Sequence, residues 1–412
     1  MEVEKGQYYV HNGELWLRHD DSGNLLPTYN AFTPDNKSAH YGTLLFEGER
    51  VNLDANGKAH LFREEEHRAR LGHGVELLDM GIKEAVVYGK EDAILTMDDF
   101  LQQAKDLVSL NFPNRDKVYV RRAVGRGAGL GVNPQGSTVE YMIMTEIWPE
   151  YLSGDAMFIS SIVRPSAQSP LVVFDPHLKL SAHYGYASMA KYEAQSINTS
   201  PPPVEPLMLN AYGNVAEASG ANIFVLYGSR ISTPKLSDGV LDGITRRTIL
   251  ESGTEAHEFS FGLDYLLKSD GVFLTGSATN VKPIRAFYIE KSFAEALEAM
   301  QMLDKNLLEK ARKNPIAAKV GYKFSKRDIT LLKFQAGTEA GERKIAEIAE
   351  WYMGVIYNRN PKFSNWLTLV EPTLSRWAKE QMKNAWEKAG LKPPAHLLNG
   401  QGMKKRVLHR SR

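Results

Sequence analysis

The chain has 412 residues, of which 43% are hydrophobic and 24% are charged, proportions that are ordinary for a globular protein. Its formal net charge of +1 provides no overall field that would draw it to nucleic acid or to a membrane surface. It contains no cysteine, which excludes disulfides, thiolate metal sites and a cysteine nucleophile and fits a reducing cytoplasm. We find no secretory signal, and no apolar run approaches the roughly 20 residues that span a bilayer.

The first 150 residues predict a small α+β domain. Residues 63–79 carry an apolar stripe of Leu71, Val75, Leu77 and Leu78, which indicates an amphipathic helix. A second helix is expected over 96–111, and the strands of this domain are expected over 7–20, 43–53, 118–120 and 140–144.

Residues 151–300 predict a larger domain in which short strands alternate with a few helices. Helices are expected over 185–197 and 244–251. The segment 177–184, which precedes the first of these helices, is interpreted as strand-like. The other strand candidates are 156–163, 170–175, 206–211, 222–226, 230–233 and 272–275.

Longer helical patterns follow, notably over 293–312 and 342–357. We expect residues 301–412 to form a mainly helical C-terminal extension with a basic, frayed end. The extension either packs on the rest of the protein and covers the site, or binds a partner, for example a carrier protein that holds the substrate.

Lys179 is the candidate reactive residue. It lies between Leu178 and Leu180, where burial would disfavour the charged ammonium form. The alternative is a lysine that simply points to water from a strand. A desolvated lysine amine is suited to form a Schiff base with a carbonyl group, which is the chemistry of pyridoxal-phosphate enzymes.

Such a site also needs an acid for the pyridine nitrogen, a hydroxyl group and a phosphate cradle. Glu217 is the acid candidate, because it lies among alanine and glycine and precedes an apolar strand. The amides of Ile244 and Thr245 begin a helix after a glycine, and a helix N-terminus suits a phosphate. Ser277 adds a hydroxyl group and Arg70 adds a fixed positive charge.

The order and spacing of these groups resemble the class IV aminotransferases, the pyridoxal-phosphate enzymes of fold type IV. Within that family the sequence is most similar to branched-chain amino-acid aminotransferases. The segments that carry the resemblance are 40–48, 62–71, 179–194, 217–224, 243–246 and 275–278. The resemblance implies an α+β fold with two domains, 1–150 and a cofactor-binding domain 151–300, to which 301–412 is added.

The resemblance also implies a role for each cofactor-binding residue. Lys179 holds pyridoxal 5'-phosphate and transfers protons, Tyr184 hydrogen-bonds the ring oxygen, and Glu217 pairs with the pyridine nitrogen. The phosphate would be held by Arg70, Ile244, Thr245 and Ser277. No metal is implied.

The substrate pocket implied by the resemblance is aromatic and suits an apolar side chain. Its residues would be Tyr41, Phe46, Tyr119, Arg121, Val132, Trp148, Tyr151 and Ala278. Arg121 would admit the second carboxylate of 2-oxoglutarate. Tyr41 and Val132 would reach the neighbouring subunit's site, so a homodimer is implied. The expected activity is transamination between an apolar, branched-chain or aromatic-like L-amino acid and a 2-oxo acid.

Several positions depart from the family pattern without removing a reacting group. His183 replaces asparagine and Arg122 replaces proline, whereas Ala218-Ser219 replaces Gly-Ala and Thr279-Asn280 replaces Ala-Glu. These departures bear on branched-chain specificity. Two alternatives to the expected activity also stay open. One is a lyase of the same fold, similar to aminodeoxychorismate lyase, and the other is a binding protein built on a degenerate enzyme body.

Overall fold

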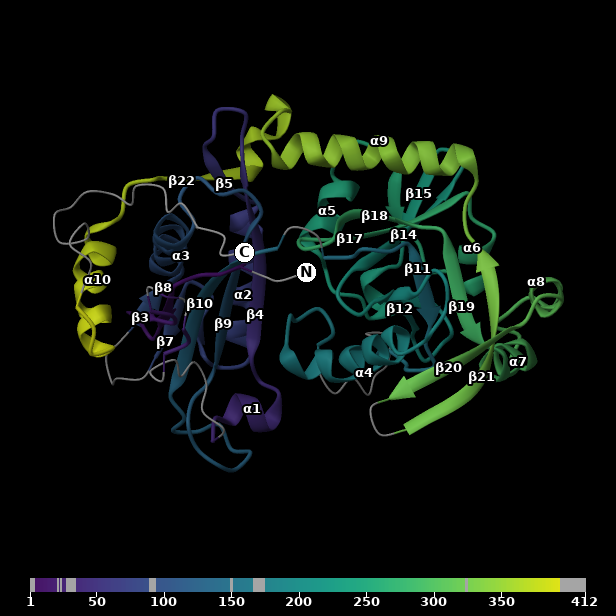
Figure 1. Cartoon of the computed structure of the whole chain (residues 1–412), viewed down its shortest axis with the longest axis horizontal. Coiled ribbons are helices and arrows are strands. Elements are labelled where there is room, and N and C mark those ends of the chain that lie inside the picture. The colour runs from purple at the N-terminus through teal and green to yellow at the C-terminus, as the bar shows by residue number, and fades with distance from the viewer. Residues whose placement is uncertain are drawn as a thin grey trace. The chain divides into compact units, whose positions relative to one another are not determined.

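The computed structural model describes residues 4–20, 22, 24–26, 35–88, 94–148, 151–165, 175–322 and 325–392. The chain divides into two compact units (Figure 1). Unit 1 consists of Met1–Pro149, Leu180–Ala182 and Val355–Arg412. Unit 2 consists of Glu150–Lys179 and His183–Gly354.

Unit 1 is built on an antiparallel eight-stranded sheet with the order β22-β5-β4-β9-β10-β2-β3, in which β1 also pairs with β10. Its strands are β1 (Glu4–Lys5), β2 (Tyr8–His11), β3 (Glu14–Leu17), β4 (Leu45–Leu53), β5 (Ala59–Phe62), β9 (Val118–Arg126), β10 (Val139–Ile147) and β22 (Leu367–Val370). The central pair, β4 and β9, places Gly48 opposite Arg121. The predicted strands 43–53, 118–120 and 140–144 are confirmed, and 7–20 is a hairpin of two strands.

The helices predicted over 63–79 and 96–111 are confirmed as α2 (Glu64–Leu77) and α3 (Met97–Asn111). A capping box fixes the start of α3, since Thr96 accepts from the Asp99 amide and Asp99 accepts from the Thr96 amide. The remaining elements of this part of unit 1 are α1 (Lys37–Tyr41) and a small sheet of β6 (Gly81–Ile82), β7 (Ala85–Val87) and β8 (Ile94–Thr96).

Unit 2 contains a six-stranded sheet, β13-β12-β11-β19-β21-β20, and a five-stranded sheet, β16-β15-β14-β17-β18. The strands are β11 (Ala156–Ile159), β12 (Pro203–Leu209), β13 (Val215–Ala218), β14 (Asn222–Tyr227), β15 (Arg230–Thr233), β16 (Ala256–Glu258), β17 (Gly271–Gly276), β18 (Asn280–Ile284), β19 (Ala286–Glu290), β20 (Ile316–Tyr322) and β21 (Ser325–Gln335). Buried side chains of both sheets, among them Met157, Leu207, Ile223 and Leu274, form one apolar core.

The helices of unit 2 are α4 (Tyr184–Gln195), α5 (Ile244–Leu250), α6 (Leu263–Leu267), α7 (Lys291–Ala299) and α8 (Lys305–Arg312). The helices predicted over 185–197 and 244–251 are thus confirmed. The pattern over 293–312 is divided into α7 and α8, because Gln301 has a positive φ of 61° and Asp304 caps a new helix. Of the strand candidate 170–175, only residue 175 lies within the described residues, and it is not in a strand.

The prediction of a strand over 177–184 was wrong. Residues 176–178 form a turn, and a short 3-10 helix, η1 (Ser181–His183), leads into α4. Between them, Leu180 makes only an isolated bridge to Leu45. The alternation of Leu178, Lys179 and Leu180 is typical of a strand, but here both leucines are buried from an irregular segment.

Residues 301–412, as far as they are described, contain α8, α9 (Glu339–Ile356) and α10 (Arg376–Lys388), together with η3 (Pro361–Trp366), in agreement with the helical character that was predicted. They also contain three strands, and they do not form a third unit, because their residues belong to both units. Strand β22 extends the unit 1 sheet beside β5, and the hairpin β20–β21 extends the unit 2 sheet beside β19. The basic end lies outside the described residues.

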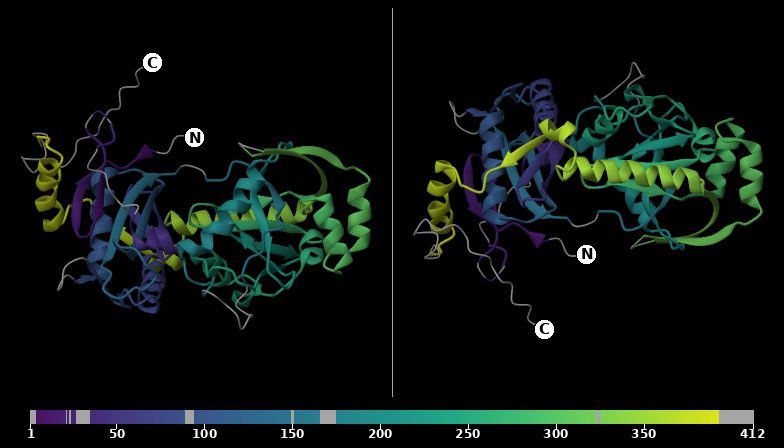
Figure 2. Two further views of the ribbon diagram at one scale, coloured as in Figure 1. Left: turned by 90° about the horizontal axis from the view of Figure 1, so that it is seen from below. Right: turned by 90° about the horizontal axis from the view of Figure 1, so that it is seen from above.

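Helix α10 packs on the N-terminal hairpin β2–β3 of the same unit (Figure 2). The buried Trp386 donates from Nε1 to the Tyr8 hydroxyl at 3.0 Å, and Trp377 donates to the Gly13 carbonyl at 3.1 Å. Lys388 pairs with Glu14 at 2.8 Å. These contacts favour a packing role for the last described helix.

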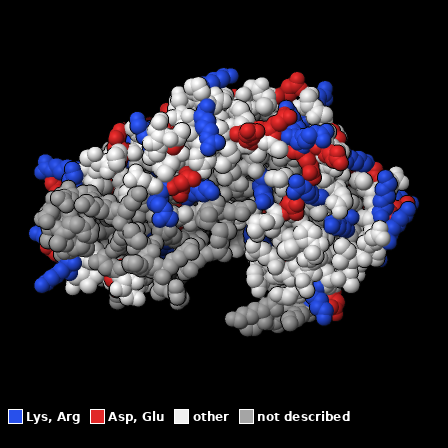
Figure 3. All heavy atoms as spheres, turned by 45° about the horizontal axis from the view of Figure 1, so that its top comes forward, with Lys and Arg blue, Asp and Glu red and all other residues white. Residues whose placement is uncertain are grey.

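No helix within the described residues is long and apolar enough to cross a membrane. On the face of the molecule in Figure 3, basic and acidic side chains are interspersed, which agrees with the small net charge.

We expect Trp386→Ala to destabilise unit 1, because it removes a buried indole that is 3% exposed and the bond to Tyr8. Truncation of a buried tryptophan typically costs about 3–5 kcal/mol. Thermal unfolding followed by circular dichroism would measure the shift, with the exposed Lys383→Ala on the same helix as control. Equal melting temperatures for both variants would contradict a packing role for α10.

Candidate active site

Lys179 and Tyr184 form the first pair of predicted site residues that the structure brings together. Lys179 Nζ donates a hydrogen bond to the Tyr184 hydroxyl at 2.8 Å. Tyr184 is the first residue of α4, and both side chains are half-buried. The amine is therefore held against the Tyr184 hydroxyl.

Glu217 lies on β13 and is 5% exposed, as the sequence predicted for an acid without a solvent-facing role. Its Oε1 pairs with Arg164 at 2.8 Å, and its Oε2 accepts from Asn222 Nδ2 at 2.8 Å and from the Leu241 amide at 3.0 Å. Burial raises the pKa of Glu217, and Arg164 partly offsets this rise because its guanidinium favours the carboxylate.

Arg164 is a site residue that sequence reasoning missed. It also donates to the Tyr186 hydroxyl at 3.1 Å and to the Gly239 carbonyl. A single arginine gives no local signal of its role. Only the fold brings it to Glu217.

The lysine and the acid lie close enough for their charges to interact. The charge of Lys179 contributes to lowering the pKa of Glu217 against the effect of burial, in addition to the larger contribution of Arg164. Burial raises the pKa of Tyr186 to about 12. Glu217 and Tyr184 also raise this pKa, whereas Arg164 lowers it. Unit 2 therefore gathers the amine, the phenol and the carboxylate into one electrostatic cluster.

Ile244 and Thr245 form the buried first turn of α5. The preceding Gly243 allows close approach to the Asn222 side chain, since a Cβ at Gly243 would lie 2.0 Å from Asn222 Oδ1. Asn222 bonds both Glu217 and the Leu241 carbonyl. It therefore couples the acid to the start of the predicted phosphate cradle.

The arginine of the Gly-Ile-Thr-Arg segment has a structural role. Arg246 is 2% exposed and donates to the Pro234 carbonyl at 2.9 Å and to Glu258. These bonds anchor α5. The other predicted phosphate group in unit 2, Ser277, lies in the short loop between β17 and β18 and is half-buried.

Arg70 lies in unit 1, on α2, and is held by Glu47 of β4. Its Nε and Nη2 donate to the two Glu47 oxygens at 2.7 Å each. His67 Nδ1 lies 2.7 Å from the same carboxylate. The bidentate pairing engages two of the five guanidinium donors and fixes the plane of the group.

Four of the predicted substrate residues form one aromatic cluster in unit 1. The rings of Tyr119 and Trp148 stack at 4.3 Å, and Arg121 lies 4.6 Å above the Phe46 ring. Arg121 also donates to the Tyr119 hydroxyl at 3.1 Å. A Cβ at Gly48 would lie 1.7 Å from that hydroxyl, so this cluster requires glycine on β4.

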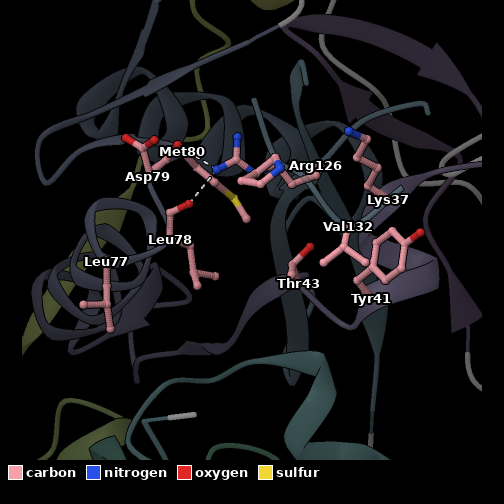
Figure 4. A pocket seen from close by; sticks show the side chains of 10 residues that line it. Lys37, Tyr41, Thr43, Leu77, Leu78, Asp79, Met80, Arg126 and Val132 are labelled. Atoms are coloured by element: carbon pink, nitrogen blue, oxygen red, sulfur yellow. Dashed lines mark hydrogen bonds between the residues drawn. The ribbon is translucent and has the colours of Figure 1, made fainter. Parts of the chain in front are cut away.

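Tyr41 and Val132 line a separate cavity of about 300 Å³ in unit 1 (Figure 4). The Tyr41 hydroxyl accepts from the Gly131 amide at 3.0 Å, and Val132 is 78% exposed. Arg126 closes one wall by donating to the Leu78 and Asp79 carbonyls. The full lining is Lys37, Tyr41, Thr43, Leu77, Leu78, Asp79, Met80, Arg126, Val132 and Pro134.

The last two predicted substrate residues, Tyr151 and Ala278, lie in unit 2. Tyr151 is 39% exposed, and Lys191 Nζ lies 5.4 Å from the centre of its ring. Its hydroxyl faces Gly220, at 3.5 Å from where a Cβ would stand. Ala278 is in the same loop as Ser277 and is half-buried.

Arg122, which replaces the family's proline, is fully buried on the face of β9 opposite to Arg121. It pairs with Glu49 of β4 at 2.6 Å and with Glu64 of α2 at 3.1 Å. The substitution therefore adds a buried charge that ties the strand of Arg121 to the helix of Arg70.

The groups of unit 2 fit pyridoxal phosphate. An accessible amine, a buried carboxylate held by an arginine, a phenol and a glycine-led helix start are the donors and acceptors that this cofactor needs. A fold and site of this kind define a pyridoxal-phosphate enzyme. The chain matches the model of the amino-transferase class IV family over residues 44–287, and it belongs to that family. It is thus a pyridoxal-phosphate-dependent aminotransferase.

Known proteins support this assignment. The branched-chain-amino-acid aminotransferase of Salmonella typhimurium is 26% identical over 294 residues, which cover 69% of this chain and 86% of the relative. Two solved branched-chain aminotransferases share the fold over essentially their whole length. That of Thermoproteus uzoniensis with norvaline has a TM-score of 0.64, 21% identity and 90% coverage of this chain. That of Thermobaculum terrenum in its PLP form has a TM-score of 0.63 and 22% identity, and the match covers 89% of this chain and 99% of the neighbour.

The Glu47 pairing predicts an acid-sensitive contribution to stability. Burial alone would raise the pKa of Glu47, but Arg70 and His67 together hold it well below its ordinary value of 4.5. A lowered carboxyl pKa stabilises the fold above the unfolded-state pKa, and this contribution is lost as pH falls below it.

We therefore expect Glu47→Gln to lower the melting temperature most above about pH 5, and the gap from wild type to narrow below about pH 4.5. Melting curves from about pH 3.5 to about pH 7.5 would measure the difference in melting temperature between the variant and the wild type across this range. The exposed Glu380→Gln is the control. A gap that does not change with pH would show that the carboxylate charge does not stabilise Arg70.

Proposed function

We propose that this aminotransferase transfers the amino group of an apolar L-amino acid, branched-chain or aromatic-like, to a 2-oxo acid such as 2-oxoglutarate. The observation that carries the proposal is the cluster of Phe46, Tyr119, Trp148 and Arg121, in which aromatic rings surround one guanidinium. Rings suit an apolar side chain, and the guanidinium suits a carboxylate. The names of the relatives agree with this substrate class.

The residues of unit 2 divide the work of the reaction. Bound pyridoxal phosphate supplies an aldehyde that condenses with amines and a ring that takes up negative charge. With the cofactor bound, Lys179 Nζ would accept the α-proton of the amino acid and would later give a proton back. Tyr184, at 2.8 Å, would orient that amine, and Glu217 would pair with the pyridine nitrogen. Arg164 favours the charged form of Glu217 that this requires.

The phosphate is proposed to lie on the amides of Ile244 and Thr245 and the hydroxyl of Ser277, where the positive end of α5 favours an anion. A contribution of Arg70 to the phosphate is what the family resemblance implies.

We also propose a cytoplasmic homodimer. Leu130 and Val132 are 75% and 78% exposed on one loop, next to the cavity that Tyr41 lines. Exposed apolar residues of this kind are suited to burial against a second copy. The resemblance implies that this loop and Tyr41 complete the partner's substrate pocket.

Lys179→Ala is expected to abolish transamination and covalent attachment of the cofactor. Borohydride reduction followed by peptide mass spectrometry would locate the attachment in the wild type, with the exposed Lys305→Ala as control. Cofactor attached to another lysine, with full turnover by Lys179→Ala, would refute the assignment. Release of pyruvate without any amino acceptor would instead indicate the lyase.

Arg121→Met is expected to raise the KM for 2-oxoglutarate by roughly tenfold or more, because it removes a charged hydrogen bond to the second carboxylate. The KM for a monocarboxylic 2-oxo acid with an apolar side chain should change by no more than about twofold, since no such bond is lost. Steady-state kinetics with both acceptors measure the difference, and the exposed Arg376→Met is the control. Parallel changes for both acceptors would remove Arg121 from acceptor recognition.

A further inference from the structure

The loop between β17 and β18 has a defined turn geometry. Gly276 pairs with Asn280, so residues 277–279 form a three-residue hairpin loop. Asn280 adopts the left-handed conformation with φ of 58°, as is common at the end of such loops. We call residues 275–280 the hairpin tip. Its loop side chains are therefore presented at fixed positions.

The hairpin tip contains three buried polar atoms without a hydrogen-bond partner, Thr275 Oγ1, Thr279 Oγ1 and Asn280 Oδ1. The Thr279 side chain belongs to a residue that is only 8% exposed, whereas the neighbouring Gly276, Ser277 and Ala278 are half-buried. Buried hydroxyls in native proteins almost always have a partner. Several orphans in one short, partly accessible segment indicate that a ligand or ordered water supplies the missing bonds.

Two glycines mark where such a ligand would approach. A Cβ on Gly276 would lie 3.5 Å from Thr279 Oγ1 and 3.4 Å from the Gly220 carbonyl. A Cβ on Gly220 would meet only the Tyr151 hydroxyl, at 3.5 Å. These are ordinary contact distances, and neither glycine has a positive φ. Backbone conformation does not require glycine at either position, and beside Gly220 the Tyr151 hydroxyl is the one described neighbour within 4 Å, so Gly220 leaves room for a ligand beside the backbone.

We infer that Thr279 is a further ligand-binding residue, whose hydroxyl donates a hydrogen bond to an oxyanion held at the hairpin tip. Thr279 Oγ1 and the Gly220 carbonyl border the same side of Gly276, and the Tyr151 hydroxyl borders Gly220. Because Tyr151 is expected in the substrate pocket, this favours the substrate carboxylate over the cofactor phosphate. The inference rests on the proposed function. It adds to the family pattern, because this chain has threonine where the resemblance has alanine.

The experiment compares Thr279→Val, which removes the hydroxyl at nearly constant shape, with Thr279→Ser, which keeps it. The probe is 4-methylvaleric acid, an unreactive apolar carboxylate, titrated calorimetrically into the enzyme loaded with pyridoxal phosphate. We expect Thr279→Val to raise its Kd by roughly tenfold or more, the loss usual for a hydrogen bond to a charged group, and Thr279→Ser to restore it. Thr233→Val, which removes a buried hydroxyl already bonded to the Ile223 carbonyl, is the matched control.

A second titration tests the other oxyanion. The apoprotein is titrated with pyridoxal phosphate and with pyridoxal, and the ratio of the two Kd values reports the phosphate contribution. If the Kd of pyridoxal divided by the Kd of pyridoxal phosphate falls for Thr279→Val but not for Thr279→Ser or Thr233→Val, the result would support oxyanion binding and assign it to the cofactor. Unchanged Kd values in both titrations would overturn the inference.

Thermal unfolding of the ligand-free protein separates binding from structure. Because Thr279 Oγ1 has no partner within the described residues, Thr279→Val should not lower the melting temperature, whereas Thr233→Val should. A lower melting temperature for Thr279→Val with unchanged Kd values would show a structural hydroxyl and overturn the inference. If wild-type protein attaches no cofactor at Lys179, the proposed function fails instead, independently of Thr279.

Discussion

The ion pair between Glu217 and Arg164 is the interaction on which the cofactor site depends. A carboxylate in the core of unit 2 would lose its charge through desolvation if it stood alone. Arg164 at 2.8 Å, with donors from Asn222 and the Leu241 amide, partly offsets that cost and fixes the carboxylate plane. Arg164 also donates to the Tyr186 hydroxyl of α4. Because α4 begins at Tyr184, the hydrogen-bond partner of Lys179, this bond links the helix to the Glu217–Arg164 pair. One buried pair thus sets both the charge of the acid and the position of the helix.

Unit 1 contains a similar buried ion pair with the roles reversed. Here the arginine, Arg70, is the residue proposed to bind the phosphate, and the carboxylate of Glu47 holds it in place. Glu47 and Glu49 lie two residues apart on β4 and therefore face the same side of the sheet. There Glu47 pairs with Arg70 and Glu49 pairs with Arg122. Removing one partner of a buried ion pair is far more destabilising than replacing both partners with apolar residues, because it leaves an unpaired buried charge. The geometry of Arg70 is consequently bound to the stability of the β4–α2 packing, and a change in either alters the other.

The sequence predicts those features that depend on neighbouring residues, such as helix caps and apolar periodicity. The helix α3 follows from its apolar period and the Thr96–Asp99 cap, and the start of α5 follows from Gly243. The proposal of Lys179, Glu217 and Tyr184 as reacting groups rests on spacing and resemblance. Arg164 could not be predicted in this way, because it reaches Glu217 only through the packing of β11, β12 and β13. Unlike β21, β20 is rich in alanine and glycine and becomes a strand by pairing, which local propensity does not reveal.

The departures from the family pattern gather behind the reacting groups rather than among them. Ser219 bonds the buried Glu205 through its hydroxyl and its amide, and Glu205 also pairs with Lys191, whose ammonium lies against the Tyr151 ring. The loop after Glu217 is thereby tied to a side chain expected in the substrate pocket. Proton transfer depends on a few atoms that this chain retains, whereas substrate choice depends on surfaces contributed by several segments. Under the proposed function, changes in the supports of Tyr151 and the hairpin tip would therefore act on which substrate fits, while the chemistry proposed for Lys179 stays the same.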